Sequence, residues 1–230
     1  MQQRTDGVVL VALAHPFSHT YALGLFFCHW TGQDVDQTLQ RAEKVIALST
    51  EYGFSMFQLL ATMVRGWCLA VVGQPEVGIA QLQQGVSLWR SSGAEVGVPF
   101  MLTLLADAYG RARQPEEGLK QLVEASRSMQ IRNERVYERG LHRIRGELLI
   151  SVRDFAGAEE SFREAIEVAQ RQSTKLSELR AAMSMARLWR DQGKREEARD
   201  LLAPVYGWFT EGHNTRDLKE AKALLEELAS

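Results

Sequence analysis

The chain has 230 residues, of which 45% are hydrophobic and 24% are charged, and its formal net charge is −2. This composition is typical of a folded globular protein, and the near-neutral charge argues against a nucleic-acid binder, which usually carries a basic excess. No apolar run reaches 18 residues, which predicts no membrane span, and two cysteines, Cys28 and Cys68, predict reduced thiols in a cytoplasmic protein.

The first apolar segment is VVLVALA, residues 8–14. It loosely resembles a secretory signal, but Asp6 offsets the single positive charge of Arg4 and the segment is short. We interpret it as the tail of a helix that packs on the next helix pair.

From Gly66 onward, small and bulky residues return at a constant interval. Small residues stand at an anchor and 12 positions later, in four successive units: Gly66 and Gly78, Ala106 and Gly118, Gly146 and Ala158, Ala186 and Ala198. A bulky residue follows each anchor by 16 positions: Leu82, Leu122, Phe162 and Leu202. An earlier unit anchored at Gly24 fits with one residue fewer in its turn. Small residues let two antiparallel helices approach closely while the bulky residue fills the groove between them, so the repeat predicts stacked helical hairpins.

Turn residues separate the expected helices. Pro75 and Pro115 suit the first helical turn, Asp154 suits an N-cap and Gly193 a C-cap. The expected helix pairs are 16–31 with 34–52, 54–72 with 75–91, 96–112 with 115–130, 134–152 with 155–171, and 174–192 with 195–209, followed by an amphipathic helix at 215–229. No alternation with period two predicts strands.

The anchors resemble a tetratricopeptide repeat (TPR): Leu102-x2-Leu105-Ala106-x2-Tyr109 resembles its first helix and Ala158-x3-Phe162-x2-Ala165 its second. The period of 40 exceeds the usual 34, which implies longer helices. The expected fold is an all-α, right-handed α-solenoid of about five extended TPR-like helix pairs plus a C-terminal capping helix. It would form one domain over 1–230, with units at about 15–52, 54–92, 95–131, 134–172 and 174–210 and the cap at 214–229.

Five segments resemble the C-terminal helical region of bacterial adenylate/guanylate cyclase–ATPase fusion proteins. They are HPFSHTYAL (15–23), RGWCLAVVGQPEVGIAQL (65–82), LLADAYGRARQPEEGL (104–119), LHRIRGELLI (141–150) and LRAAMSMARLWRDQGKREEARDLLAPVYGWFTEG (179–212). The Gly193-Lys194 pair is not a phosphate-binding loop, because Leu188 stands where that motif requires glycine. The resemblance therefore implies a regulatory or interaction region rather than the chemistry of the fusion proteins.

First helices line the concave face of such solenoids, which gives a candidate partner-binding groove. Its candidate residues are Tyr21, Met63, Trp67, Asp107, Arg139, Arg143, Glu147, Arg187 and Arg190. The groove would begin apolar and end charged, which suits a peptide or protein partner with an acidic segment. Alternatively, the apolar members pack within the repeats and the arginines form a solvated face paired with neighbouring carboxylates.

No catalytic constellation is recognisable. His15 and His19 are four residues apart, but no third ligand is near them in the sequence, so we expect no metal and no cofactor. We expect a non-enzymatic protein–protein interaction module, the regulatory or sensor arm of a cyclase–ATPase signalling protein. The alternative is a structural self-association module that forms a homodimer through the apolar N-terminal end, residues 8–14.

Overall fold

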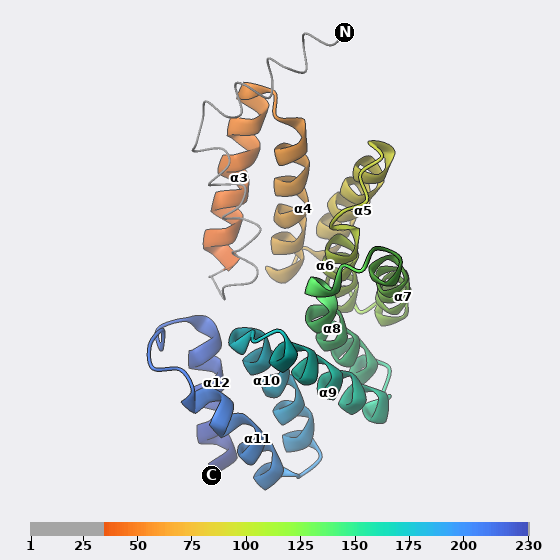
Figure 1. Cartoon of the computed structure of the whole chain (residues 1–230). Coiled ribbons are helices and arrows are strands. Elements are labelled where there is room, and N and C mark those ends of the chain that lie inside the picture. The colour runs from red at the N-terminus through yellow and green to blue at the C-terminus, as the bar shows by residue number, and fades with distance from the viewer. Residues whose placement is uncertain (1–34, 230) are drawn as a thin grey trace. The chain divides into compact units, whose positions relative to one another are not determined.

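The computed structural model describes residues 35–229, in which the chain forms two compact units that part between Val96 and Gly97. All regular secondary structure in this range is helical (Figure 1). The helix expected at 16–31, which carries Tyr21, and the apolar segment 8–14 lie outside the described residues.

The first unit contains three described helices. They are α3 (Val35–Tyr52), α4 (Ser55–Val71) and α5 (Pro75–Ser91), each within one residue of its expected bounds. Helix α4 packs against both α3 and α5. Between α3 and α4 lies a core of Val35, Ala42, Val45, Ala61, Val64 and Cys68, in which Cys68 is a buried thiol.

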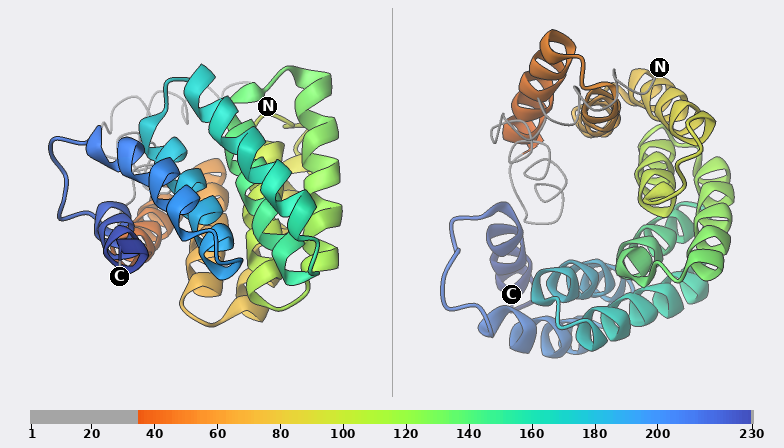
Figure 2. Two further views of the ribbon diagram at one scale, coloured as in Figure 1. Left: turned by 90° about the horizontal axis from the view of Figure 1, so that it is seen from below. Right: turned by 45° about the horizontal axis from the view of Figure 1, so that its top comes forward.

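The second unit continues the hairpin pattern. Its helices are α6 (Val98–Arg111), α7 (Pro115–Arg132), the 3-10 turn η1 (Arg135–Tyr137), α8 (Glu138–Ser151), α9 (Phe155–Arg171), α10 (Lys175–Asp191), α11 (Arg195–Gly207) and α12 (Arg216–Ala229). The first helices α6, α8 and α10 each pack on the second helix that follows and on the next first helix, with α12 in the place of a further first helix. First helices lie on the inner side of this unit and second helices on its outer side (Figure 2).

One expected helix starts differently. The range 134–152 begins as the 3-10 turn η1, and α8 starts only at Glu138. The start of α6 explains this, because the Glu134 carboxylate accepts a hydrogen bond from the Gly97 amide at 3.2 Å and the Tyr137 ring lies 5.6 Å from that of Phe100. These two contacts hold the segment before α8 against α6.

Close contacts at two anchor glycines confirm the role predicted for the small residues. A Cβ atom added at Gly66 would lie 3.0 Å from the Gly78 carbonyl oxygen, and one added at Gly146 would lie 2.6 Å from Cδ1 of Phe162. Both distances are shorter than ordinary carbon contacts. The anchor and the bulky residue 16 positions later are therefore a packed pair.

Each of the helices α3 to α10 is followed by a residue with a left-handed backbone, and these residues are evenly spaced at half the repeat period. They are Gly53, Gly73, Gly93, Arg113, Asn133, Arg153, Ser173 and Gly193. The next amide often closes the turn on the carbonyl five residues back, as from Gln74 to Leu69 at 2.8 Å and from Asp154 to Leu149 at 2.9 Å. This is the Schellman C-cap, which satisfies carbonyls that the helix leaves without partners.

The expected caps are confirmed. The Asp154 side chain accepts a hydrogen bond from the Gly157 amide at 2.9 Å, and Pro75 and Pro115 stand in the first turns of α5 and α7. Proline is harmless there, because no preceding carbonyl requires its missing N–H.

Two glycines of α8 test the packing argument in opposite directions. Gly146→Ala is expected to lower the free energy of unfolding by about 1 to 3 kcal/mol, because its methyl group would overlap the fully buried ring of Phe162. Gly140→Ala meets no atom within 4 Å and is expected to raise it by up to about 1 kcal/mol through helix propensity. Urea unfolding of both variants measures this, and a neutral Gly146→Ala would contradict the close approach.

Candidate functional site

Two apolar candidates of the first unit, Met63 and Trp67, pack within its hairpins. Met63 on α4 is buried, with its sulfur against Gly85 of α5, and Trp67 packs on the core between α3 and α4. The third apolar candidate, Tyr21, lies outside the described residues. The side chains of Met63 and Trp67 therefore stabilise the hairpins, as the alternative interpretation expects.

Charged candidates of the second unit form a row across its first helices, called the charged row below. Its members are Asp107 on α6, Arg139, Arg143 and Glu147 on α8, and Arg187 and Arg190 on α10. On α6, Asp107 is only 9% exposed and contacts Arg111, with Oδ2 and Nε 3.2 Å apart. On α8, Arg143 forms an ion pair with Glu147, whose Oε1 also accepts a hydrogen bond from the Ser184 hydroxyl of α10 at 3.1 Å. The row thus contains both signs of charge, linked from helix to helix.

Arg143 lies where several carboxylates converge. Burial alone would lower the pKa of its guanidinium, but the negative charges of Glu147, Asp107 and Asp217 outweigh burial and raise that pKa above its ordinary value. These carboxylates come from α8, α6 and α12 respectively. Arg143 is therefore the positive centre of an acidic neighbourhood and stays charged at every physiological pH.

Arg139 links α8 to the following turn and helix. Its side chain donates to the Ser177 hydroxyl at 2.9 Å, to the Gln172 side-chain oxygen at 2.5 Å and to the Val136 carbonyl. Only 6% of the residue is exposed, and burial, followed by the nearby charge of Arg180, lowers its pKa. In this arrangement Arg139 joins α8 to the start of α10.

The arginines of α10 face the terminal helix α12. Arg187 lies 3.0 Å from Glu220, and Arg190 lies 3.0 Å from Glu227, measured between nitrogen and oxygen. Arg190 also donates to Asp191, the main reason that its pKa is raised. Both predicted arginines are thus next to carboxylates on a helix to which the sequence assigned only a capping role.

Sequence reasoning missed a further arginine, Arg180. Its guanidinium holds the Asp217 carboxylate in a bidentate pair, with nitrogen–oxygen distances of 2.9 to 3.2 Å. Three contacts between successive first helices join residues 37 apart: Glu147 with Ser184, Arg180 with Asp217, and Arg190 with Glu227. This interval is slightly shorter than the repeat, so about one helical turn offsets each first helix from the next. The sequence of a single helix carries no signal for this offset, so it could not have pointed to Arg180.

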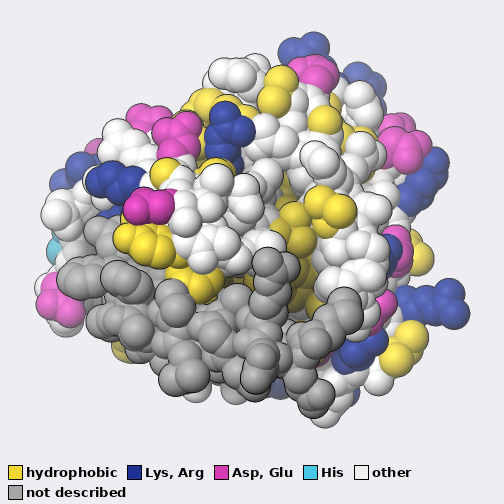
Figure 3. Space-filling view, turned by 90° about the horizontal axis from the view of Figure 1, so that it is seen from above, with side chains coloured by type: hydrophobic (Ala, Val, Ile, Leu, Met, Phe, Trp, Pro, Cys, Tyr) yellow, Lys and Arg dark blue, Asp and Glu magenta, His cyan; other side chains and the backbone are white. Residues whose placement is uncertain are grey.

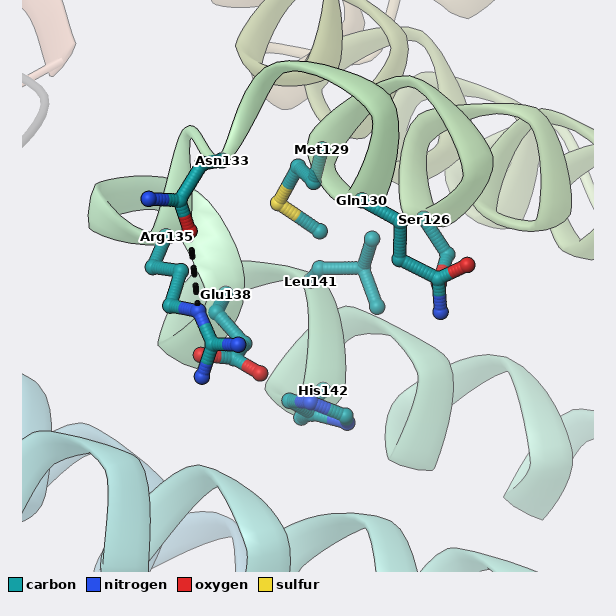
Figure 4. A pocket seen from close by; sticks show the side chains of 8 residues that line it. All are labelled: Ser126, Met129, Gln130, Asn133, Arg135, Glu138, Leu141 and His142. Atoms are coloured by element: carbon teal, nitrogen blue, oxygen red, sulfur yellow. Dashed lines mark hydrogen bonds between the residues drawn. The ribbon is translucent and has the colours of Figure 1, made fainter.

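A second feature of this unit is a cavity of about 430 Å³ between α7, η1 and α8 (Figure 4). Its lining residues are Ser126, Met129, Gln130, Asn133, Arg135, Glu138, Leu141 and His142. Nδ1 of His142 lies 2.8 Å from Oε2 of Glu164, and burial lowers the pKa of His142 despite that carboxylate. The cavity therefore combines apolar and charged lining residues with a histidine that is neutral near neutral pH.

Nowhere in residues 35–229 do three or more His, Cys, Asp or Glu side chains come together as a metal site. Within the same range, no helix combines the length and apolarity that crossing a bilayer requires.

No protein-family model matches the sequence, and no curated protein sequence matches it either. Solved structures do resemble it. Two contain nearly identical TPR-like repeats of a Podosopora anserina putative kinesin light chain. One of them, a substituted form, has 18% identity and a TM-score of 0.53 over 82% of this chain and 92% of that one, and the other has 16% and 0.51 over 91% and 95%. The apo form of RapI has 10% identity and a TM-score of 0.58 over 92% and 82%.

These similarities confirm the predicted fold class. The chain has the fold of a TPR-like helical repeat protein. The resemblance to cyclase–ATPase fusion proteins is a separate matter and stays a prediction.

The pair of Arg180 and Asp217 should contribute most to stability among these contacts. Their side chains are 22% and 14% exposed, so Arg180→Ala would leave a largely buried carboxylate without its bidentate donor. We expect the free energy of unfolding to fall by about 2 kcal/mol. Arg199→Ala, which removes an exposed contact to Asp200, should change it by less than about 0.5 kcal/mol. Equal losses in denaturant unfolding would contradict this ranking.

Proposed function

We propose that the chain is a non-enzymatic protein-interaction module whose inner face, formed by the first helices of the second unit, binds a peptide or protein segment. The observation that carries this proposal is the charged row itself. Side chains of Arg143, Glu147 and Arg187 retain exposed fractions of 23%, 37% and 41% while lying on two successive first helices. Partly exposed charges of both signs at fixed spacing suit an extended or helical partner with complementary charges.

The charges on one face of the molecule favour a local site over a general electrostatic one. On the face drawn in Figure 3, basic and acidic side chains are interspersed rather than separated by sign. A polyanion binder would present a continuous basic surface. Specificity would therefore come from the order of charges along the row.

We further propose that this module is the regulatory or sensor arm of a cyclase–ATPase signalling protein. The support is the resemblance of the five sequence segments, among them 65–82 and 179–212. In that setting binding at the inner face would alter the activity of other domains, and the chain itself should give no turnover of ATP.

A displayed peptide library tests the binding proposal. Peptides selected on the full chain should bind about tenfold more weakly to the variant Arg143→Gln with Glu147→Gln, because both charges of a first-helix pair are removed. The matched control is Glu159→Gln with Arg163→Gln, a pair of the same spacing on the second helix α9, which should leave affinity unchanged. If the affinity falls only in the control variant, the outer face is the binding surface. If it falls in neither variant, the peptides bind at neither of these two places and the proposal is wrong.

The second candidate is self-association through residues 8–14, favoured by the apolar segment VVLVALA. Light scattering distinguishes the two: a stable dimer that is lost when residues 1–14 are deleted supports self-association, whereas a monomer supports the binding module.

A further inference from the structure

Helix α12 occupies the position that a further first helix would take. It packs on α10 and α11, beyond the segment 208–215 that follows α11 (Figure 1).

Three carboxylates of α12 match three arginines of α10. Beside the bidentate pair of Arg180 and Asp217 stand the pairs of Arg187 with Glu220 and of Arg190 with Glu227. The carboxylates lie at intervals of three and seven residues, which places them on one side of a helix. They neutralise both arginines that α10 contributes to the proposed binding row.

An apolar stripe accompanies these charges. Leu218, Ala221, Leu224 and Leu228 are all buried in the core shared with α10 and α11. Together the stripe and the carboxylates define a recognisable ligand: an amphipathic helix with an acidic edge. The side of α10 that carries Arg180, Arg187 and Arg190, called the α10 face below, therefore already binds one helix of this chemistry, supplied by its own chain.

The attachment of α12 is weakest at Glu220 and Glu227 and at its connection. The side chains of these two residues are 38% and 50% exposed, and ion pairs so exposed are weak and sensitive to salt. The connecting segment 208–215 is not helical and contains Gly212 with a left-handed backbone. Outside the buried stripe and the pair of Arg180 with Asp217, these contacts are open to solvent.

We propose that α12 is a resident ligand of the α10 face, and that the partner of this module is an acidic amphipathic helix of the same pattern, which displaces it. The inference rests on the proposed function, because it names the partner and the regulation of the same row. While the tethered helix occupies the face, no external helix can bind there. The apparent association constant of an external helix is therefore its intrinsic value multiplied by the fraction of time that the face is vacant. Weakening α12 should therefore tighten external binding.

The test uses the full chain and a fluorescent peptide of residues 211–229 as the external helix. The variant Glu220→Arg with Glu227→Arg keeps the α10 arginines but repels the resident helix from them. It should bind the unsubstituted peptide at least about tenfold more tightly than the unsubstituted chain does, as measured by fluorescence anisotropy. Glu226→Arg, whose carboxylate lies 3.7 Å from exposed Lys222, is the matched control and should leave the affinity unchanged.

A charge exchange separates recognition from loosened structure. The full-chain variant Arg187→Glu with Arg190→Glu should prefer a peptide carrying Glu220→Arg and Glu227→Arg over the unsubstituted peptide. Circular dichroism checks that the helices persist; if the α12 variant loses helix, Glu227→Gln replaces it and should still tighten binding. Equal affinities for both peptides, or no tightening in either α12 variant, would overturn the proposal.

The outcomes also distinguish this inference from the proposed function. If the peptide of residues 211–229 binds as expected but no library peptide binds the row, α12 is a ligand for the chain itself and the partner proposal fails. If library peptides bind the row without acidic helical character, the proposed function stands and the resident-ligand inference fails.

Discussion

The close packing of two helices at their small residues, seen in the hairpins α4–α5 and α8–α9, is the constraint on which the other features depend. At Gly66 and Gly78 the two main chains nearly touch, and at Gly146 the space of a side chain is taken by the Phe162 ring. Such contacts leave little freedom in how a first helix sits on its second helix. This geometry recurs in successive hairpins of the second unit. The positions of each first helix that face away from its second helix therefore lie on the same inner side of that unit.

Contacts between successive first helices then give the row its character. Several of them are polar: Glu147 bonds to Ser184, Arg139 to Ser177, and Arg180 to Asp217. Partly buried ion pairs gain strength from reduced screening, but each charge must keep its partner. The row that serves as a candidate binding surface is therefore also part of what holds the second unit together, and a partner must match these charges rather than merely attract one sign.

Within residues 35–229 the repeat pattern was enough to predict the helices apart from the start of α8, because small residues, prolines and caps act locally. The N-cap at Asp154 and the prolines that open α5 and α7 followed from neighbouring residues alone. The start of α8 could not be predicted in this way, since Glu134 and Tyr137 are held by residues at the beginning of α6. A local sequence pattern does not predict contacts between residues that lie far apart in the sequence.

In the candidate site, too, some features could be predicted from the sequence and others depend on contacts between distant residues. Sequence reasoning placed Arg143, Glu147, Arg187 and Arg190 on first helices, where they lie. It did not foresee that Arg139 would be buried against Ser177, or that Arg180 would matter. Both depend on the offset of about one turn between successive first helices, which results from packing of whole hairpins and has no signature in any single segment.

The evenly spaced left-handed residues have a consequence for how such a chain can change in length. Four of the eight, Arg113, Asn133, Arg153 and Ser173, are not glycine, so the backbone reversal is kept even where the side chain disfavours it. An insertion of one complete repeat would leave every reversal at a helix end and every anchor opposite its bulky partner. An insertion of one or two residues inside a helix would instead move the reversal away from the packed pair. Such a protein is expected to grow or shrink during evolution by whole hairpins, with shorter insertions confined to connections such as residues 208–215.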